Sequence, residues 1–291
     1  DSSTSRGLGD VYKRQESIVG ILNGTTNYIL SQMTENGVNY ANALADAQKQ
    51  GFAEADPTND VCGFDAARKL AILSSIGFRA NVTFDDVLVE GIEKIDKSDI
   101  QYAKDMGYTI KLLTVALRQE NGIALNVYPA FLPDNHPLSS VKGAYNAIYV
   151  TGNIVDDVMF YGRGAGALPT ASAVMGDVIS TAQHILNGST GTGMIMTDTK
   201  RIPFYSSLKL QNSYYFRLDV DDVTGVLSQI AAAFAENDIS ICEVVQKRKT
   251  KGLAELVLIT ELASRESILQ VEKALQVLPC MRKVANVIRV M

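Results

Sequence analysis

Apolar residues recur along this chain at spacings that predict short strands followed by amphipathic helices. The apolar run SIVGIL at Ser17–Leu22 predicts a buried strand, and Thr26–Glu35 has helical spacing after an Asn-Gly-Thr turn. The segment Val87–Ile95 is interpreted as a strand. The same periodicity predicts further helices over residues 40–50, 56–76, 98–106 and 169–186.

Local signals suggest where two of these helices begin. Asp56 followed by Pro57 is a good helix start, with an Asp N-cap and proline at the first helical position. Ser98 is the expected cap of the 98–106 helix. The long helix from Asp56 is expected to run to about Ile76 and to stop at Gly77.

Two β-hairpins are expected in the middle of the chain. Apolar runs at Ile110–Arg118 and Ile123–Phe131 flank the turn sequence QENG, and a second hairpin is expected over Ala147–Tyr161, turning at Gly152. Hairpins favour an α+β fold over a doubly wound parallel sheet. We therefore expect a mixed or antiparallel sheet with helices on one face.

The segment NGSTGTG at Asn187–Gly193 is a break in composition and predicts a linker. After it, the order strand, helix, strand, strand, helix, strand predicts a ferredoxin-like βαββαβ unit. The expected domains are therefore 16–190 and 212–291, joined by a linker over 191–211. Residues 1–15 are polar and without period, and are interpreted as a non-native or disordered leader.

Composition and charge exclude several classes of function. A net charge of −5 disfavours nucleic acid or an anionic membrane as partner, and no uncharged apolar run is long enough to cross a bilayer. The scarce cysteines and histidines make a disulfide framework, a zinc site or a Ser-His-Asp triad a poor fit, so no metal is expected; they are Cys62, Cys242, Cys280, His136 and His184. A reducing cytoplasm is the expected location.

Acidic and basic residues are densest between Ala47 and Lys69. Asp65 and Lys69 lie four residues apart and share a helix face, while Glu54 and Asp60 lie at or before its first turn. Carboxylates bind an ammonium ion through charge-assisted hydrogen bonds, and a lysine beside them can protonate a developing alkoxide. On spacing alone, a surface ion pair worth about 0.2–0.5 kcal/mol is the commoner outcome.

The string AQKQGFAEADPTNDVCGFDAARK at Ala47–Lys69 resembles the signature of the homoserine dehydrogenase family. The segments GILNGTTNYIL at Gly20–Leu30 and GRGAGALPTASAVMGD at Gly162–Asp177 agree with it, and the resemblance covers Ile18 to about Leu186. It implies interconversion of L-homoserine and L-aspartate 4-semialdehyde with NAD or NADP, in threonine, methionine and isoleucine biosynthesis. The choice between NAD and NADP stays open.

The resemblance also implies roles for the charged residues. Lys69 is expected to donate a proton to the carbonyl oxygen as hydride arrives at carbon. Glu54 and Asp65 are expected to bind the substrate, with Asp60 supporting them.

Further residues are implied to contact the ligands. Thr25 and Gly24 would contact the substrate, and Gly51 and Gly166 would lie beside the cofactor, where a bare backbone can approach closely. The structural alternatives are a helix N-cap for Thr25 and a helix C-cap for Gly51. Phe52 occupies a position where some relatives carry tyrosine.

The glycine-rich segment Gly162–Gly166 reads G-x-G-x-G and is not a dinucleotide-binding fingerprint. In the family that fingerprint lies upstream, and nothing before Glu16 resembles it. We therefore expect the nucleotide-binding domain to be missing and the chain alone to be inactive. The alternative function is a non-catalytic amino-acid-binding regulatory module.

The C-terminal unit resembles an ACT domain in the string DVDDVTGVLSQIAAAFAENDISI at Asp219–Ile241. Its strand-to-helix loop offers backbone N–H groups and a helix N-terminus to an amino-acid carboxylate. The resemblance implies feedback by L-threonine, with the alternative that the unit only mediates dimerisation, and a homodimer through the sheet of the first domain. The expected regulatory residues are Asp222, Gly225, Asn237 and Ile239.

Overall fold

The structure, a computed structural model, describes residues 15–154, 156–189, 202–250 and 252–291. The predicted leader lies outside the described residues except for Gln15, which is the first residue of a strand, and residues 191–201 of the predicted linker also lie outside them. Within the described ranges, no helix is long and apolar enough to cross a membrane.

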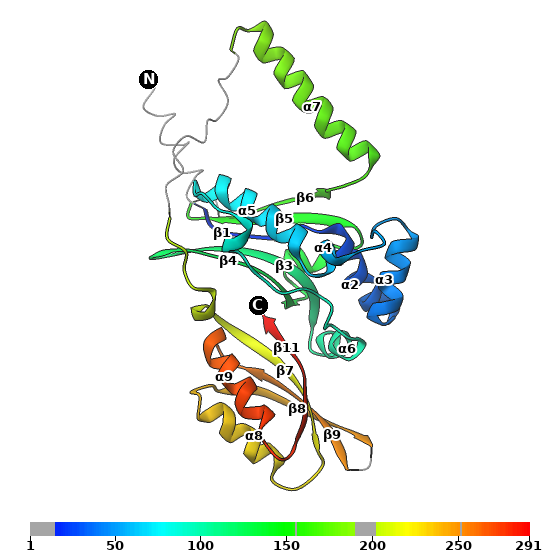
Figure 1. Cartoon of the computed structure of the whole chain (residues 1–291), viewed down its shortest axis with the longest axis vertical. Helices are drawn as coiled ribbons and strands as arrows, with labels where there is room; N and C mark the ends of the chain where they lie inside the picture. Colours follow the sequence, from blue (N-terminus) through cyan, green and yellow to red (C-terminus); the bar gives the residue numbers. More distant parts are fainter. Residues whose placement is uncertain (1–14, 155, 190–201, 251) are drawn as a thin grey trace.

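The first unit contains a sheet and the helices that cover it (Figure 1). Its elements in chain order are β1 (Gln15–Ile21), α2 (Gly24–Asn36), α3 (Tyr40–Lys49), α4 (Thr58–Val61), α5 (Phe64–Phe78), η1 (Phe84–Asp86), β2 (Leu88–Val89), α6 (Lys97–Asp105), β3 (Tyr108–Gln119), β4 (Gly122–Pro133), η2 (Pro137–Ser140), β5 (Tyr145–Gly152), β6 (Asp156–Arg163) and α7 (Ala167–Leu186). The long strands follow the order β6-β5-β1-β3-β4, and each pair in this series is antiparallel.

The two faces of this sheet bury different clusters. Along β3, Leu112 and Ala116 face a core built with α2, α3, α5 and α6, whereas Leu113 and Val115 face a second cluster that includes Leu138 in η2. Alternate residues of a strand point to opposite faces, so this split follows from the sequence of β3 itself. The α+β prediction is confirmed, and α2, α3, α5 and α6 cover one face of the sheet.

The predicted 56–76 helix is wrong in one respect, because the structure has two helices there. The chain breaks between α4 and α5 at Gly63, which has a left-handed φ of 82°. A Cβ on Gly63 would lie 3.1 Å from side-chain carbons of both Val89 and Val127, so glycine is needed for conformation and for space. Pro57 occupies the N-cap position of α4, and the Asp56 carboxylate accepts from Thr58 N instead.

The predictions for residues 87–106 also need correction. Only Leu88–Val89 form a strand, because the chain then turns so that Ile92 N donates to Val61 O of α4 at 2.9 Å. The cap of α6 is Asp96 rather than Ser98, since the Asp96 carboxylate accepts from the backbone of Ser98 and Asp99.

The second unit has the predicted βαββαβ order. It contains η3 (Ser207–Lys209), β7 (Gln211–Asp221), α8 (Val226–Ala235), β8 (Ile241–Thr250), β9 (Leu253–Thr260), β10 (Ala263–Ser264), α9 (Arg265–Gln276) and β11 (Met281–Val290). Its strands follow the order β11-β7-β9-β8, and apolar residues of α8 and α9 pack on one face.

The two units share one sheet, which the sequence did not predict. β11 pairs in parallel with β4 through Arg289↔Ala130 and Val290↔Phe131. The main core of the first unit therefore continues into the second, where Tyr215 stacks on Phe131 with ring centroids 4.5 Å apart.

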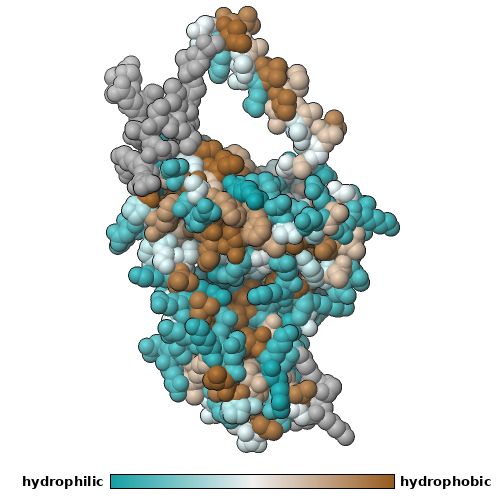
Figure 2. Space-filling view, viewed as in Figure 1, coloured by the Kyte–Doolittle hydropathy of each residue, from teal (hydrophilic) through white to brown (hydrophobic). Residues whose placement is uncertain are grey.

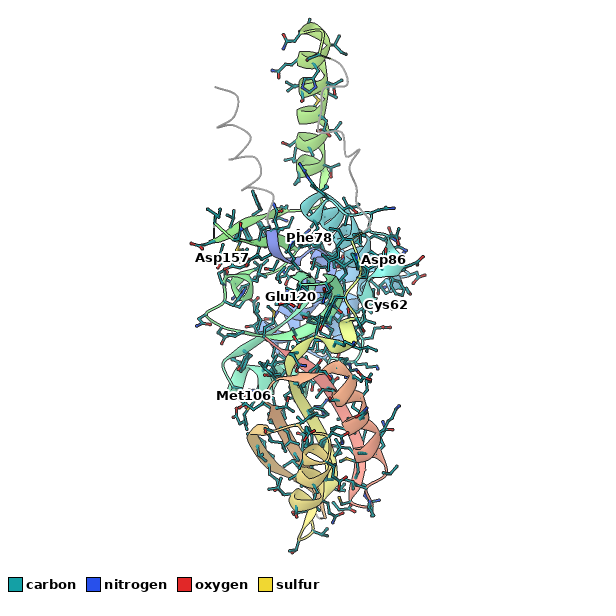
Figure 3. The ribbon with its side chains drawn as sticks, turned by 90° about the vertical axis from the view of Figure 1, so that its left-hand side faces the viewer. Cys62, Phe78, Asp86, Met106, Glu120 and Asp157 are labelled. Atoms are coloured by element: carbon teal, nitrogen blue, oxygen red, sulfur yellow. The ribbon has the colours of Figure 1, made fainter. Side chains whose placement is uncertain are left out.

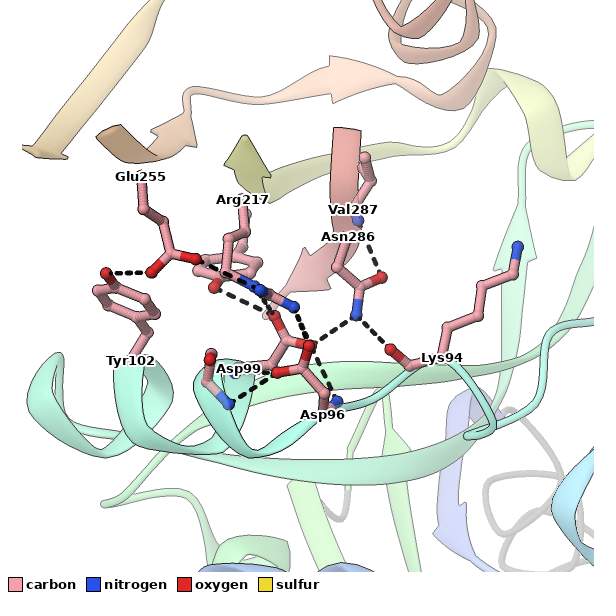
Figure 4. A network of polar contacts seen from close by, with 10 residues as sticks. Lys94, Asp96, Asp99, Tyr102, Arg217, Glu255, Asn286 and Val287 are labelled. Atoms are coloured by element: carbon pink, nitrogen blue, oxygen red, sulfur yellow. Dashed lines mark hydrogen bonds and ion pairs between the residues drawn. The ribbon is translucent and has the colours of Figure 1, made fainter. Parts of the chain in front are cut away.

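A buried polar network crosses the same boundary (Figure 4). Arg217 on β7 is 5% exposed, and its Nε donates to Oδ1 of the fully buried Asp99 on α6 at 2.7 Å. Asn286 on β11 donates to the other Asp99 oxygen at 2.7 Å, and Tyr102 donates to Glu255 at 2.9 Å. Charged groups buried in this way are matched by partners from the opposite unit, as expected for buried ions.

Helix α7 lies apart from this body. Figures 1 and 3 show it at one end of the molecule, away from the sheet, and Figure 2 shows apolar residues along it. Leu168 is 83% exposed, and no residue of α7 is buried against the described part of the chain.

Candidate active site

A cavity of about 620 Å³ lies where the N-terminus of α2 meets α4, α5 and the segment after β6. Most of the charged residues that the sequence singled out line it, together with the predicted glycines. The lining residues are Asn23, Gly24, Thr25, Gln50, Gly51, Phe52, Glu54, Asp56, Asn59, Asp60, Asp65, Arg68, Lys69, Ala144, Asn146, Arg163, Gly164, Ala165 and Gly166.

Lys69 lies in this cavity on α5, one turn after Asp65. Its Nζ is 2.7 Å from Asp65 Oδ2 and donates to Leu22 O at 3.1 Å. The Lys69 side chain is still 47% exposed, so its amine is fixed in direction and remains accessible. A held but accessible ammonium can donate a proton to a ligand oxygen.

Asn23 joins the carboxylates, and the sequence reasoning missed it as a site residue. Its Oδ1 accepts from Thr26 N at 2.8 Å and so caps α2, while its Nδ2 donates to Asp60 at 2.7 Å and to Asp65 at 2.8 Å. The available signal was an asparagine directly before a helix, where its side chain caps the backbone.

Asp60 is held close to Asp65 through this amide. Burial raises the pKa of the Asp60 carboxyl above its usual value; the hydrogen bond from Asn23 opposes this and the charge of Asp65 adds to it. Burial and the charge of Asp65 both disfavour the ionised form of Asp60, and a cation beside it would stabilise that form.

Thr25 and Gly24 lie in the first turn of α2, beside Asp60. Thr25 Oγ1 donates to Phe52 O at 2.7 Å, so the alternative of Thr25 as the helix cap is wrong; Asn23 occupies that position. A Cβ on Gly24 would lie 3.0 Å from Ala144 O, so the backbone of the helix start passes close to the neighbouring segment.

The remaining predicted residues lie at the rim. Glu54 lines the cavity and is exposed, without a described side-chain partner. Gly51 has a φ of 78° and comes directly after Gln50, which is the C-cap of α3, so Gly51 lies one residue beyond the cap position predicted for it. Gly166 begins α7 with a φ of 118°. Within the described ranges, no group of His, Cys, Asp and Glu is arranged to hold a metal.

A second buried cluster shapes one wall of the cavity. Lys111 on β3 donates to Asn27 Oδ1 at 3.0 Å and to Val141 O at 2.5 Å. Asn27 Nδ2 in turn donates to the carbonyl oxygens of Val141, Gly143 and Tyr145. These hydrogen bonds hold the segment that contains Ala144, a residue of the cavity wall. The only sequence signal for them was a lysine inside an apolar strand.

The predicted regulatory residues of the second unit do not converge. Gly225 lines a cavity of about 190 Å³ at the start of α8, whereas Asn237 and Ile239 line another of about 370 Å³ beyond its end. Asp222 N donates to Gly252 O. No local sequence signal distinguishes the two cavities.

Comparison with known proteins identifies the family of both units. The family model described as homoserine dehydrogenase matches residues 8–179, and the ACT domain model matches residues 214–280. The chain is 43% identical over 282 residues to the homoserine dehydrogenase of Mycobacterium tuberculosis and 39% identical over 280 residues to that of Bacillus subtilis. These matches cover 94% and 95% of the chain but 64% of each relative's length.

Solved structures agree with this result. A homoserine dehydrogenase from Thiobacillus denitrificans superposes with a TM-score of 0.90 at 34% identity, covering 100% of this chain and 67% of that one. The Staphylococcus aureus homoserine dehydrogenase structure at pH 6.0 gives a TM-score of 0.72 at 30% identity, covering 96% and 66%. With more than half its length matched by the family model, the chain belongs to the homoserine dehydrogenase family.

Proposed function

We propose that this chain provides the substrate-binding and proton-transfer part of a cytoplasmic homoserine dehydrogenase, which interconverts L-homoserine and L-aspartate 4-semialdehyde. The observation that carries the proposal is the Lys69 amine, held by Asp65 and by Leu22 O in a cavity that Glu54 and Asp60 also line. An ammonium donor beside several carboxylates suits a substrate that has both a carbonyl to protonate and an ammonium to bind.

The charged residues have two separate roles when L-aspartate 4-semialdehyde is reduced. Lys69 Nζ gives a proton to the oxygen that was the carbonyl, and its positive charge stabilises the alkoxide as that oxygen gains electrons. Glu54, Asp65 and Asp60 bind the substrate ammonium. Thr25 and the backbone of Gly24 contact the substrate at the start of α2, where the helix dipole favours its carboxylate.

NAD or NADP supplies the hydride when bound, and the rim of the cavity fits a cofactor that approaches the backbone. No described atom lies within 4 Å of a Cβ placed on Gly51, so that part of the rim is open. Gly166 lies on the same rim and, like Gly51, has a positive φ. Both positions suit close passage of a nicotinamide cofactor.

The second unit supplies regulation in this proposal, with residues 16–190 catalytic and 212–291 regulatory. The cavity at Gly225 and the cavity at Asn237 and Ile239 each have a size that suits an amino acid. L-threonine is the proposed effector and should raise the melting temperature by binding the native state. A homodimer is proposed through the edge of the sheet at β6, where Phe160 is exposed.

The test is NADPH-dependent reduction of L-aspartate 4-semialdehyde by the protein expressed from its complete gene. Replacing Lys69 by alanine should lower kcat by about 100-fold or more. Lys49→Ala, at an exposed lysine near the end of α3, is the matched control and should leave the rate unchanged. A Lys69→Ala protein with the full rate would refute the proposed role.

A further inference from the structure

Asn146 on β5 is a cavity residue to which neither the sequence nor the family match assigns a role. Its side chain lines the active-site cavity and also an adjoining apolar groove of about 420 Å³, and Lys69 lines both as well. Asn146 Nδ2 lies 3.5 Å from Leu22 O, the carbonyl to which Lys69 Nζ also donates. The Asn146 amide and the Lys69 amine therefore donate to the same carbonyl oxygen.

The other end of this amide has no partner. Asn146 Oδ1 is buried, and it accepts no hydrogen bond from any described residue. Buried polar atoms are nearly always paired, because an unpaired acceptor loses its water without compensation. Such an atom at the wall of a ligand cavity indicates that a ligand supplies the missing donor.

Gly164 explains why the amide can lie where it does. A Cβ on Gly164 would overlap with Asn146 Nδ2 and lie 3.1 Å from its Cγ. A Cβ on Gly162, two residues earlier, would meet no described atom within 4 Å. The middle glycine of the G-x-G-x-G segment thus makes room for Asn146, which gives that segment a role other than phosphate binding.

The groups around Asn146 Oδ1 indicate which donor a bound ligand would offer to it. Oδ1 lies beside the start of α2, 3.4 Å from a Cβ placed on Gly24. A helix N-terminus attracts the carboxylate of an amino acid, and in an α-amino acid the ammonium is attached to the carbon next to that carboxylate. An acceptor beside a carboxylate bound at this helix start would be within reach of the α-ammonium.

We propose that Asn146 is a substrate-positioning residue whose Oδ1 accepts a hydrogen bond from the α-ammonium of the bound amino acid. Gly164 is the residue that keeps this amide in place. The inference rests on the proposed function and adds a neutral acceptor to the carboxylates already assigned. Because the contact is made equally in the ground state and in the transition state, its loss should raise KM and leave kcat nearly unchanged.

The experiment is a double-mutant cycle on the protein expressed from its complete gene, with L-homoserine oxidation as readout. Asn146→Ala should raise KM for L-homoserine by about tenfold or more, since hydrogen bonds to charged groups contribute that much. Gly164→Ala should raise KM similarly by displacing the amide. In the Asn146→Ala background it should add nothing, because the obstructed group is gone. Gly162→Ala is the matched control and should keep the wild-type KM.

The possible outcomes distinguish a failure of the Asn146 inference from a failure of the proposed function. A wild-type KM in the Asn146→Ala protein, or a Gly164→Ala protein indistinguishable from Gly162→Ala, would overturn the inference, and so would full additivity in the double variant. A thermal melt of each variant separates a folding defect from a binding defect. If the unchanged protein does not oxidise L-homoserine, the proposed function itself is refuted.

Discussion

Lys111 should make the stability of this protein depend on pH in the alkaline range. Its side chain is 2% exposed, and burial lowers the pKa of Lys111 from 10.5 to about 8, with the charge of Lys142 acting in the same direction and that of Glu35 against it. Below about pH 8 the lysine is protonated in both the folded and the unfolded chain, so the folded state carries the whole cost of the buried charge. As the pH rises further, the folded state loses the proton first and the cost disappears.

The magnitude follows from the two pKa values. A pKa difference of about 2.5 corresponds to about 3 kcal/mol, of which about 2 kcal/mol is recovered between about pH 7 and about pH 9.5. The free energy of unfolding of the wild type should therefore rise by about 2 kcal/mol over this range relative to Lys111→Met, which has no proton to lose. The variant also loses two hydrogen bonds, but that loss shifts its curve without changing the slope.

Urea denaturation followed by circular dichroism, repeated at several pH values, measures this difference. Lys104→Met, at an exposed lysine of α6, is the matched control and should follow the wild type at every pH. If the wild-type and Lys111→Met curves stay parallel to within about 0.5 kcal/mol, the reasoning about the buried ammonium is refuted.

Three further substitutions test the buried ion pair of Arg217 and Asp99, the Asp60 carboxyl and the glycine between α4 and α5. Arg217→Met should cost about 3–5 kcal/mol in urea denaturation because it leaves Asp99 buried without its cation, and a loss under about 1 kcal/mol would contradict this. Asp60→Asn should raise or preserve the melting temperature, because the raised pKa of Asp60 means that ionising this carboxyl costs the folded state stability, and it should weaken L-homoserine binding; a marked drop in melting temperature would argue against the raised pKa. Gly63→Ala should cost about 1–3 kcal/mol, and more than Gly107→Ala, whose φ is also positive but whose Cβ would meet no described atom within 4 Å. Equal losses would contradict the role of packing at Gly63.

The local parts of the fold could be predicted because their signals lie within a few residues. Apolar runs on both sides of Asn121-Gly122 placed the β3–β4 hairpin, and the spacing of Asp65 and Lys69 placed both on one helix face. The break at Gly63 was missed because the side chains that leave no room for a Cβ there, Val89 and Val127, come from distant parts of the chain.

The parts of the site that depend on distant contacts could not be predicted. Asn23 reaches Asp60 and Asp65 across 37 and 42 positions in the sequence, and no periodicity reports such a contact. The pairing of β11 with β4 could not be predicted for the same reason, since the apolar pattern of a strand does not indicate which strand pairs with it. The unpaired oxygen of Asn146 became visible only when its surroundings were known.

The strand pairing between β4 and β11 limits how the second unit can influence the first. A hinge opening between them would separate Arg289 from Ala130 and Arg217 from Asp99, although Arg217 would keep Glu255 from its own unit. It would also part the stacked rings of Tyr215 and Phe131 and expose the core that the two units share, so a swinging motion is disfavoured. An effector held by the second unit would instead change the twist of the common strands, and α6, which carries Asp99, would move with them.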